Sequence, residues 1–350
     1  MKKIKGIKSV DIKIEAEGFG VVNFNGSASI FSRQAGKYVN NHMLPKMRGV
    51  DMMRVKNFED IDEKAKLYIS QNCIKNALFG GFTYNLKNVS LSNVDEVLSS
   101  IVGLVRGFVI AEGSTSLKRK SPLLIEDFVA SKDTTLNYEQ FSQAGARNET
   151  SIFSKHTTGE VKYDAYASIN IEDLQFLPLE DTFNRSCYRE IISEEQGQEL
   201  ANKITEFLKS LDFDEKYSPE AVFSNNYVRI NAISKEGEAG ILLNEDAITL
   251  LVEEIVSLIK DLYISRSRAY VKVKNIFVDY NSEKTMRIKD GIEYIDEEKD
   301  EDYAIYYEAM PFSAEEYREK VKEQEREKSE KAKKSKKETK KKEEKTEKEE

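Results

Sequence analysis

Residues 161–171, V-K-Y-D-A-Y-A-S-I-N-I, decide the fold class of this chain. Apolar or small side chains alternate with polar ones throughout, the former at Val161, Tyr163, Ala165, Ala167, Ile169 and Ile171. Successive side chains of a β-strand point to opposite faces, so this period of two predicts a strand with one buried and one solvated face. Such strands are typical of antiparallel sheets, in which one face meets solvent.

Two further segments show the same alternation, one near each end of the folded part of the chain. Residues 10–16 are apolar at every second position, and the pattern continues through Val22 and Phe24. Residues 269–273 repeat it with Ala269, Val271 and Val273. We therefore expect at least three long strands of this kind.

Three other segments have the spacing of amphipathic helices. The first runs from about Glu63 to Phe79 and is followed by Gly80-Gly81, a left-handed stop signal. The second begins at Ser193, and Gln196 completes a capping box. The third covers about Glu245 to Tyr263. Half-polar strands interleaved with long amphipathic helices predict an α+β fold, an antiparallel sheet with helices on one face.

The rest of the chain divides into long irregular segments and a charged tail. Segments 31–62, 112–160 and 281–312 lack clear periodicity, and loops of that length are uncommon unless they have a function. From Lys322 to Glu350 there are 13 Lys or Arg and 10 Glu, a net charge of +3, and a single alanine is the only apolar residue. With nothing to bury, this tail is predicted to be disordered.

The bulk composition bounds the class of protein. The chain has 350 residues, 39% of them hydrophobic, which is enough for a substantial core. Two distant cysteines, Cys73 and Cys187, indicate free thiols in a reducing compartment, and no secretory signal or membrane span is recognisable. We therefore expect a soluble, cytoplasmic protein that meets no membrane.

Motifs for catalysis or metal binding are missing from the sequence. The two histidines, His42 and His156, have no metal-ligand spacing, and neither a G-x-S-x-G elbow nor a phosphate-binding P-loop occurs. We expect no cofactor and no metal. Arg106-Gly107-Phe108-Val109 is similar to the first signature of RNA-recognition motifs but lacks its remaining aromatic residues.

Basic residues gather in three places although the net charge is −8. Residues 31–54 carry five cations and a single acidic residue, Asp51, together with amides, hydroxyls, Phe31 and Tyr38. The second group is Lys118-Arg119-Lys120, and the third is Arg147, Lys155 and His156 in a polar loop. Cations neutralise phosphates and flat side chains support unstacked bases, so the first segment has the composition of a path for a nucleic-acid backbone. Acidic residues concentrate elsewhere, in 293–308.

These segments resemble the Cas-seven family, the backbone subunits of type I CRISPR interference complexes. The resemblance covers roughly residues 7–280 and includes V-N-F-N-G-S-A-S-I, S-R-Q-A-G-K-Y and N-N-H-M-L-P-K-M-R-G near the start, then G-S-T-S-L-K-R-K-S-P-L-L-I-E-D-F before the strand at 161–171. It implies a ferredoxin-like, RRM-like antiparallel sheet with helices on one face and long finger and thumb insertions. The domain would span 1–312, with insertions at about 31–62 and 112–160, and 313–350 would be the tail.

The resemblance also implies function and site residues. The chain would be a non-catalytic subunit that binds a guide RNA (crRNA), lines up with further copies of itself and with other complex subunits, and presents the guide to a target nucleic acid. The loop Gln140–Thr158 matches the thumb that reaches the neighbouring copy. The residues expected to contact RNA are Ser32, Arg33, Gln34, Lys37, Lys46, Arg48, Lys118, Arg119, Lys120, Lys155 and His156.

Two alternatives stay open at the level of sequence. In type III relatives, an aspartate in the loop after the first strand supports cleavage of target RNA, and Asp51, with Asp60 and Asp62 nearby, lies in or near that loop. The glycine-rich type III signature is missing, however, and Gln71–Ala77 stands in its place. The second alternative is a structural protein that binds no nucleic acid.

Overall fold

A large, mostly antiparallel sheet forms the centre of the molecule. The computed structural model describes residues 6–34, 36–48, 57, 64–82, 84, 88–113, 115–144, 150–180, 187–188, 193–227, 237–266, 268–283, 286–291 and 298–304. Within these residues the strand order is β10 (Thr134–Thr135), β5 (Lys64–Ile69), β9 (Phe128–Ala130), β13 (Glu160–Asn170), β1 (Ser9–Phe19), β18 (Ala269–Asn281) and β17 (Tyr263–Arg266), and β4 (Met47–Arg48) and β8 (Leu123–Ile125) pair with β5 and β13.

The three strands expected from the alternation are the middle of this sheet. β1 pairs antiparallel with β13 along its whole length and with β18 on its other edge. Val10, Ile12 and Ile14 are fully buried, as are Ala167 and Ile169 of β13. The alternating pattern is thus confirmed as the signature of the central strands, because their apolar faces form the core. Its expected continuation through Val22 and Phe24 is wrong, because β1 ends at Phe19 and Phe24 begins a new strand, β2 (Phe24–Ser32).

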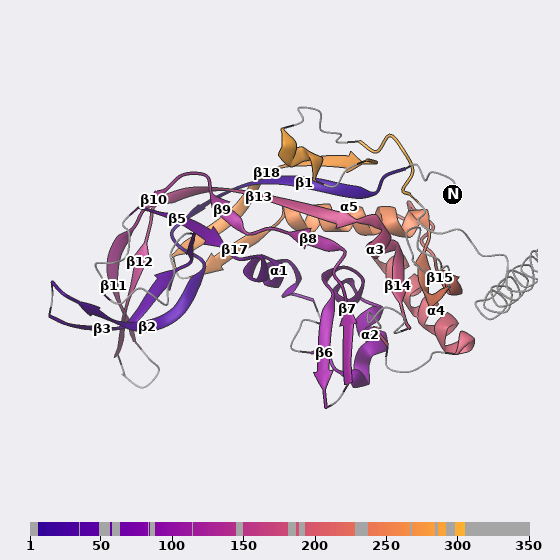
Figure 1. Cartoon of the computed structure of the whole chain (residues 1–350), viewed down its shortest axis with the longest axis horizontal. Coiled ribbons are helices and arrows are strands. Elements are labelled where there is room, and N and C mark those ends of the chain that lie inside the picture. The colour runs from indigo at the N-terminus through magenta and orange to yellow at the C-terminus, as the bar shows by residue number, and fades with distance from the viewer. Residues whose placement is uncertain are drawn as a thin grey trace, which may run out of the picture.

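Helices cover this core, and the two long ones begin at recognisable N-caps. α4 (Glu194–Leu211) begins at Ser193, and the predicted capping box with Gln196 is formed. α5 (Glu245–Lys260) begins at Asn244, whose side chain accepts a hydrogen bond from the Ala247 amide (2.9 Å). α5 lies along the central strands, with α1 (Gln71–Phe79) beneath the same sheet (Figure 1). α2 (Val94–Leu98) and α3 (Ile171–Gln175) are short.

Three smaller sheets extend from the centre. Their strands are β2 (Phe24–Ser32), β3 (Lys37–Pro45), β12 (Thr150–Thr157) and β11 (Asn137–Ala144) in the first; β14 (Phe176–Pro178), β16 (Glu238–Leu243) and β15 (Ala221–Tyr227) in the second; and the hairpin of β6 (Phe108–Glu112) and β7 (Thr115–Arg119) in the third. The first sheet and the β6–β7 hairpin project to the same side of the central sheet, and α1 lies between them (Figure 1). The second sheet and α4 lie at the opposite end from the first.

The structure corrects several sequence expectations. The helix expected over Glu63–Phe79 is a strand, β5, followed by α1, because Leu67 and Ile69 are buried where β5 pairs with β4 and β9. Gly80 has φ −68° and does not supply a left-handed stop. The segments 31–62 and 112–160, expected to be irregular, contain β3 and β4 and the strands β7 to β12. α5 ends at Lys260, and Tyr263 begins β17.

The mixed α+β class is confirmed, and most of the regular structure is strand. The expected boundary at 312 and the charged tail lie outside the described residues. Cys73 and Cys187 are both free thiols, as expected. None of the helices in the described part of the chain is long and apolar enough to span a membrane.

Candidate nucleic-acid interface

The tip of the β2–β3 hairpin exposes cations beside an aromatic ring. Ser32, the last residue of β2, is buried, whereas Arg33 and Gln34 in the turn and Lys37 at the start of β3 are exposed. Tyr38 is 64% exposed and meets Phe31 edge-on, with the ring centroids 5.3 Å apart. The tip therefore offers cations and a flat apolar side chain to solvent, the combination that single-stranded nucleic acid requires.

The base of the same hairpin carries a second group of cations. Lys46 and Arg48 both lie over the ring of Tyr68 on β5, with Nζ 5.9 Å and Cζ 4.5 Å from its centroid. Arg48 also pairs with Asp127. The other carboxylate oxygen of Asp127 accepts a hydrogen bond from the backbone N–H of Gln71 (2.7 Å), in the first turn of α1. Asp127 thus ties Arg48 of the hairpin base to the start of α1.

Lys155 and His156 on β12 face inward in this chain. Lys155 is 6% exposed, its Nζ lies 5.9 Å from the ring centroid of Phe24, and burial lowers its pKa. Nδ1 of His156 lies 2.8 Å from Nε2 of fully buried His42 on β3. Burial lowers the pKa of both histidines to about 4, with a smaller effect of His156 on His42. The pair is therefore neutral at pH 7 and links β3 to β12.

The three basic residues at 118–120 do not form a single patch. Lys118 and Lys120 are exposed, and Lys120 pairs with Asp173 at 2.6 Å. Arg119 is 5% exposed, and its guanidinium donates to the backbone carbonyls of Gly103, Leu104, Asp173 and Phe176. Arg119 thus fastens the β6–β7 hairpin to the rest of the molecule, and its expected RNA contact stays a prediction.

The remaining site expectations divide between described and undescribed residues. Asp51 and Arg147 lie outside the described part of the chain. The segment Gln140–Thr158, expected to be the thumb, falls mostly on the β11–β12 hairpin, which joins β3 through parallel pairing at His42 and Met43.

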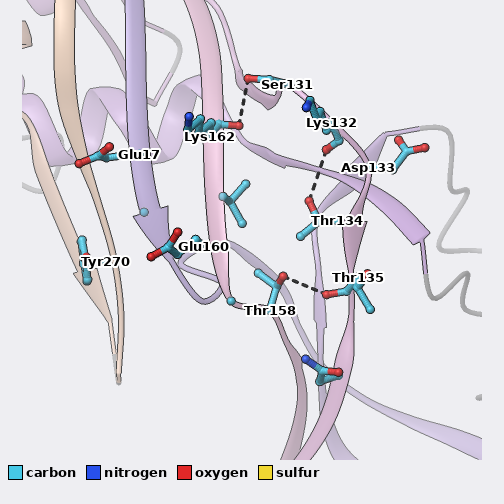
Figure 2. Close-up of a pocket in the computed structure, with 14 residues that line it drawn as sticks. Glu17, Ser131, Lys132, Asp133, Thr134, Thr135, Thr158, Glu160, Lys162 and Tyr270 are labelled. Carbon is cyan, nitrogen blue, oxygen red and sulfur yellow. Dashed lines mark hydrogen bonds between the residues drawn. The ribbon is translucent and has the colours of Figure 1, made fainter.

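A polar cavity of about 670 Å³ opens where this hairpin joins the central sheet (Figure 2). Its walls carry charges of both signs, including Lys132, Lys162 and Glu160. They also carry hydroxyl groups that donate hydrogen bonds to backbone carbonyls. Thr158 Oγ1 donates to the Thr135 carbonyl (2.9 Å), and Ser131 Oγ donates to the Lys162 carbonyl (3.2 Å). These hydrogen bonds fix the root of the hairpin to the sheet. Among the described residues, no group of three or more His, Cys, Asp or Glu side chains could hold a metal.

Sequence reasoning missed a third group of polar residues, on and beside α1. Asn72, Lys75 and Asn76 share one face of α1, and Arg106 ends a π-helical segment, Val102–Arg106. Asn72 and Asn76, four residues apart, both fall within the helix expected over Glu63–Phe79, so their shared face could have been predicted from the sequence. The proximity of this face of α1 to Arg106 could not be predicted from the sequence.

Comparison with known proteins identifies the family. Residues 6–310 match a family model described as "Type I-Fv CRISPR-associated protein Cas7fv-like". No curated protein matches the chain. Among solved structures, a chain described as "CRISPR RNA-guided surveillance complex, pre-nicking" is 11% identical with a TM-score of 0.24, over 65% of this chain and 80% of that chain. The family match extends over nearly the whole described part of the chain and confirms the resemblance drawn from the sequence: the protein belongs to the Cas7fv-like family of type I-Fv CRISPR-associated proteins.

Proposed function

We propose that this chain is a non-catalytic backbone subunit that binds guide RNA in a CRISPR ribonucleoprotein. The observation that carries the proposal is the family match over residues 6–310, since Cas7 proteins of type I systems are CRISPR complex subunits. The distribution of cations supports it. Lys37 at the hairpin tip and Arg48 at its base are exposed, Lys46 beside Arg48 is half-buried, and Lys118 is exposed on the β6–β7 hairpin.

These cations suit recognition of a backbone rather than of base edges. Lys46 and Arg48 both lie over the ring of Tyr68, and a phosphate beside them would be neutralised chiefly by Lys46, because Arg48 already pairs with Asp127. In CRISPR complexes, sequence is read by pairing between guide and target, and the protein holds the guide through its backbone. Binding that is independent of sequence is therefore the expected behaviour.

Assembly along the guide would use the β11–β12 hairpin. The hairpin projects from the central sheet beside β2 and β3 (Figure 1), and its root is held by Thr158 and Ser131. In our proposal its outer part contacts the next copy of the chain, as the Cas-seven resemblance implies. The guide then pairs with a target nucleic acid along the line of copies.

A length series of RNAs tests binding and assembly separately. Gel shifts with the full chain on short and long single-stranded RNAs should show one retarded band on the shortest and a ladder of bands on the longest. Shortening the outer part of the segment 140–158, with Lys155, His156 and Thr158 kept, should leave the single band intact and remove the ladder. Absence of any shift, together with purified protein that carries no extractable RNA, would contradict the proposed function.

A further inference from the structure

Phe213 is the most exposed large apolar side chain among the described residues, at 91%. It lies in the turn after α4, where the Asp212 carboxylate accepts hydrogen bonds from the backbone N–H groups of Lys216 (3.1 Å) and Tyr217 (2.7 Å). Glu215, in the same turn, has φ +50°, a left-handed conformation that disfavours residues other than glycine. The turn is therefore held in one strained conformation that keeps a phenyl ring in solvent, and such strain is typical of sites with a function.

A cavity of about 640 Å³ lies beside this ring. Buried Pro219 and half-buried Tyr217 form part of its wall, together with Thr205 and Lys209 of α4. The hydroxyl of Tyr217 donates a hydrogen bond to Glu253 of α5 (2.6 Å), and its ring packs against the core. An exposed ring on a fixed turn, next to a cavity with an aromatic wall, is a surface that an aromatic segment can cover.

The last described residues of the chain end close to this surface. The backbone N–H of Tyr303 donates a hydrogen bond to the carboxylate of Glu245, the first residue of α5 (3.1 Å). Burial raises the pKa of the Tyr303 hydroxyl, and nearby Glu253 and Tyr217 are among the smaller causes. Tyr217 is also a wall of the cavity, so the chain that continues from Ala304 starts beside it.

The sequence that follows Ala304 differs from the charged tail. Residues 305–312 read I-Y-Y-E-A-M-P-F, with three aromatic rings and a single charge, whereas alanine is the only apolar residue in 322–350. The family match extends to residue 310, which places most of this segment within the conserved domain. Eight residues span up to roughly 26 Å when extended, enough to cross a neighbouring cavity. Rings of this number are stable only against an apolar surface.

We propose that residues 305–312 dock over the cavity beside α4, with the ring of Phe312 against the ring of Phe213. The occupant of this surface is thus a segment of the same chain, and the contact fastens the root of the charged tail to α4. The docking goes beyond RNA binding and does not depend on it, because α4 lies at the opposite end of the molecule from the β2–β3 hairpin (Figure 1).

A double-mutant cycle in the full chain tests the contact. Phe213→Ala and Phe312→Ala should each lower the melting temperature by about 3 °C or more, because each removes one partner of a covered aromatic pair. The double variant should lose about as much as either single variant, since the effects of two residues in contact do not add. Phe19→Ala is the control: Phe19 is 46% exposed at the end of β1, and its loss should add to that of Phe312→Ala.

A cross-link tests proximity without relying on stability. In the full chain carrying Phe213→Cys, Phe312→Cys and Cys73→Ser, a short bis-maleimide should join residues 213 and 312 within one chain. Cys187 is fully buried and should not react. Mass spectrometry of the tryptic peptides identifies the linked pair. The control variant, with Phe19→Cys in place of Phe213→Cys, should give no such link.

Three results would overturn the inference. An unchanged melting temperature in Phe213→Ala would show that its ring is left uncovered. Additive losses in the double variant would show that the two rings do not meet. A cross-link found only between two chains would show that the surface receives a second copy. None of these measurements involves RNA, so the proposed function stands or fails separately.

Discussion

Acidification should loosen the sheet that carries the β2–β3 hairpin, because a buried histidine pair holds it together. Nε2 of His42 and Nδ1 of His156 are 2.8 Å apart, and the two side chains are 0% and 7% exposed. One nitrogen must donate and the other accept, so the accepting ring must be neutral, and the lowered pKa of both histidines keeps both rings neutral at pH 7. Tyr138 on β11 lies near both rings: it is tilted relative to His42 and edge-on to His156, with ring centroids 5.9 and 6.3 Å away.

The magnitude follows from the difference in pKa between folded and unfolded states. Burial lowers the pKa of each histidine to about 4, whereas an unfolded histidine titrates near 6.5. The unfolded chain thus binds more protons between these values, and the contribution of the pair to stability, complete above pH 6.5, is lost as pH falls toward 4. Between pH 7 and pH 5 the loss is about 2 kcal/mol per histidine at most, or about 4 kcal/mol for the pair.

A non-titrating replacement isolates this effect from the carboxylates that titrate in the same range. In the double variant His42→Gln and His156→Asn, each amide can occupy the position of the ring nitrogen it replaces, so the hydrogen bond is retained without the titration. Urea unfolding at pH 7 and pH 5, followed by circular dichroism, should show a smaller loss of stability in the double variant than in wild type. Equal losses in the two proteins would refute the assignment of acid sensitivity to the pair.

Three further predictions concern the tail, the loop at Asp51 and the turn into β6. Deleting residues from Lys322 onward should leave the melting temperature within a few degrees of wild type, because the tail has almost nothing to bury; a larger fall in a thermal scan would mean that it docks on the body. Asp51→Ala should leave labelled target RNA uncut, as in wild type, when the assembled complex is incubated with magnesium; regular cuts by wild type that this variant abolishes would establish the type III-like activity. Gly107→Ala should lower the free energy of unfolding in urea by about 1–2 kcal/mol or more, because Gly107 has φ +72° and the new Cβ would meet the Arg119 carbonyl. Gly113→Ala is the control: Gly113 has φ +61° but open space around it, so this variant should lose less stability. Equal losses in the two variants would mean that the close approach to Arg119 costs nothing.

The sequence predicted the central strands because their burial is one-sided. The period of two in β1 and β13 reflects direct contact of every second side chain with the core, and α4 was recognised by its capping box. The segment Lys64–Ile69 was assigned to a helix because a window of six residues is too short to distinguish the helical period of about 3.6 residues from the strand period of about two. Its strand state depends on pairing with β4 and β9, which lie elsewhere in the sequence.

The candidate site was predicted in composition but not in geometry. Lys118, Arg119 and Lys120 looked like one patch, yet alternation along β7 places Arg119 on the same buried side as Leu117. That division was available from the sequence once the strand was recognised. His42 and His156 could not be paired in advance, because 114 residues separate them and only the parallel contact of β3 with β12 brings them together.

The salt dependence of RNA binding tests the central claim most directly. Lys37 and Lys46 are the suitable pair, since Arg48 also holds Asp127 and its loss would disturb α1. In Lys37→Gln/Lys46→Gln, affinity for unrelated single-stranded RNAs should fall about equally, and the slope of log affinity against log salt should fall by roughly 1.4, or 0.7 per phosphate contact. Lys209→Gln on α4 serves as the control and should match wild type. An unchanged affinity and slope in the double variant would contradict the claim that the β2–β3 hairpin and its base line the RNA path.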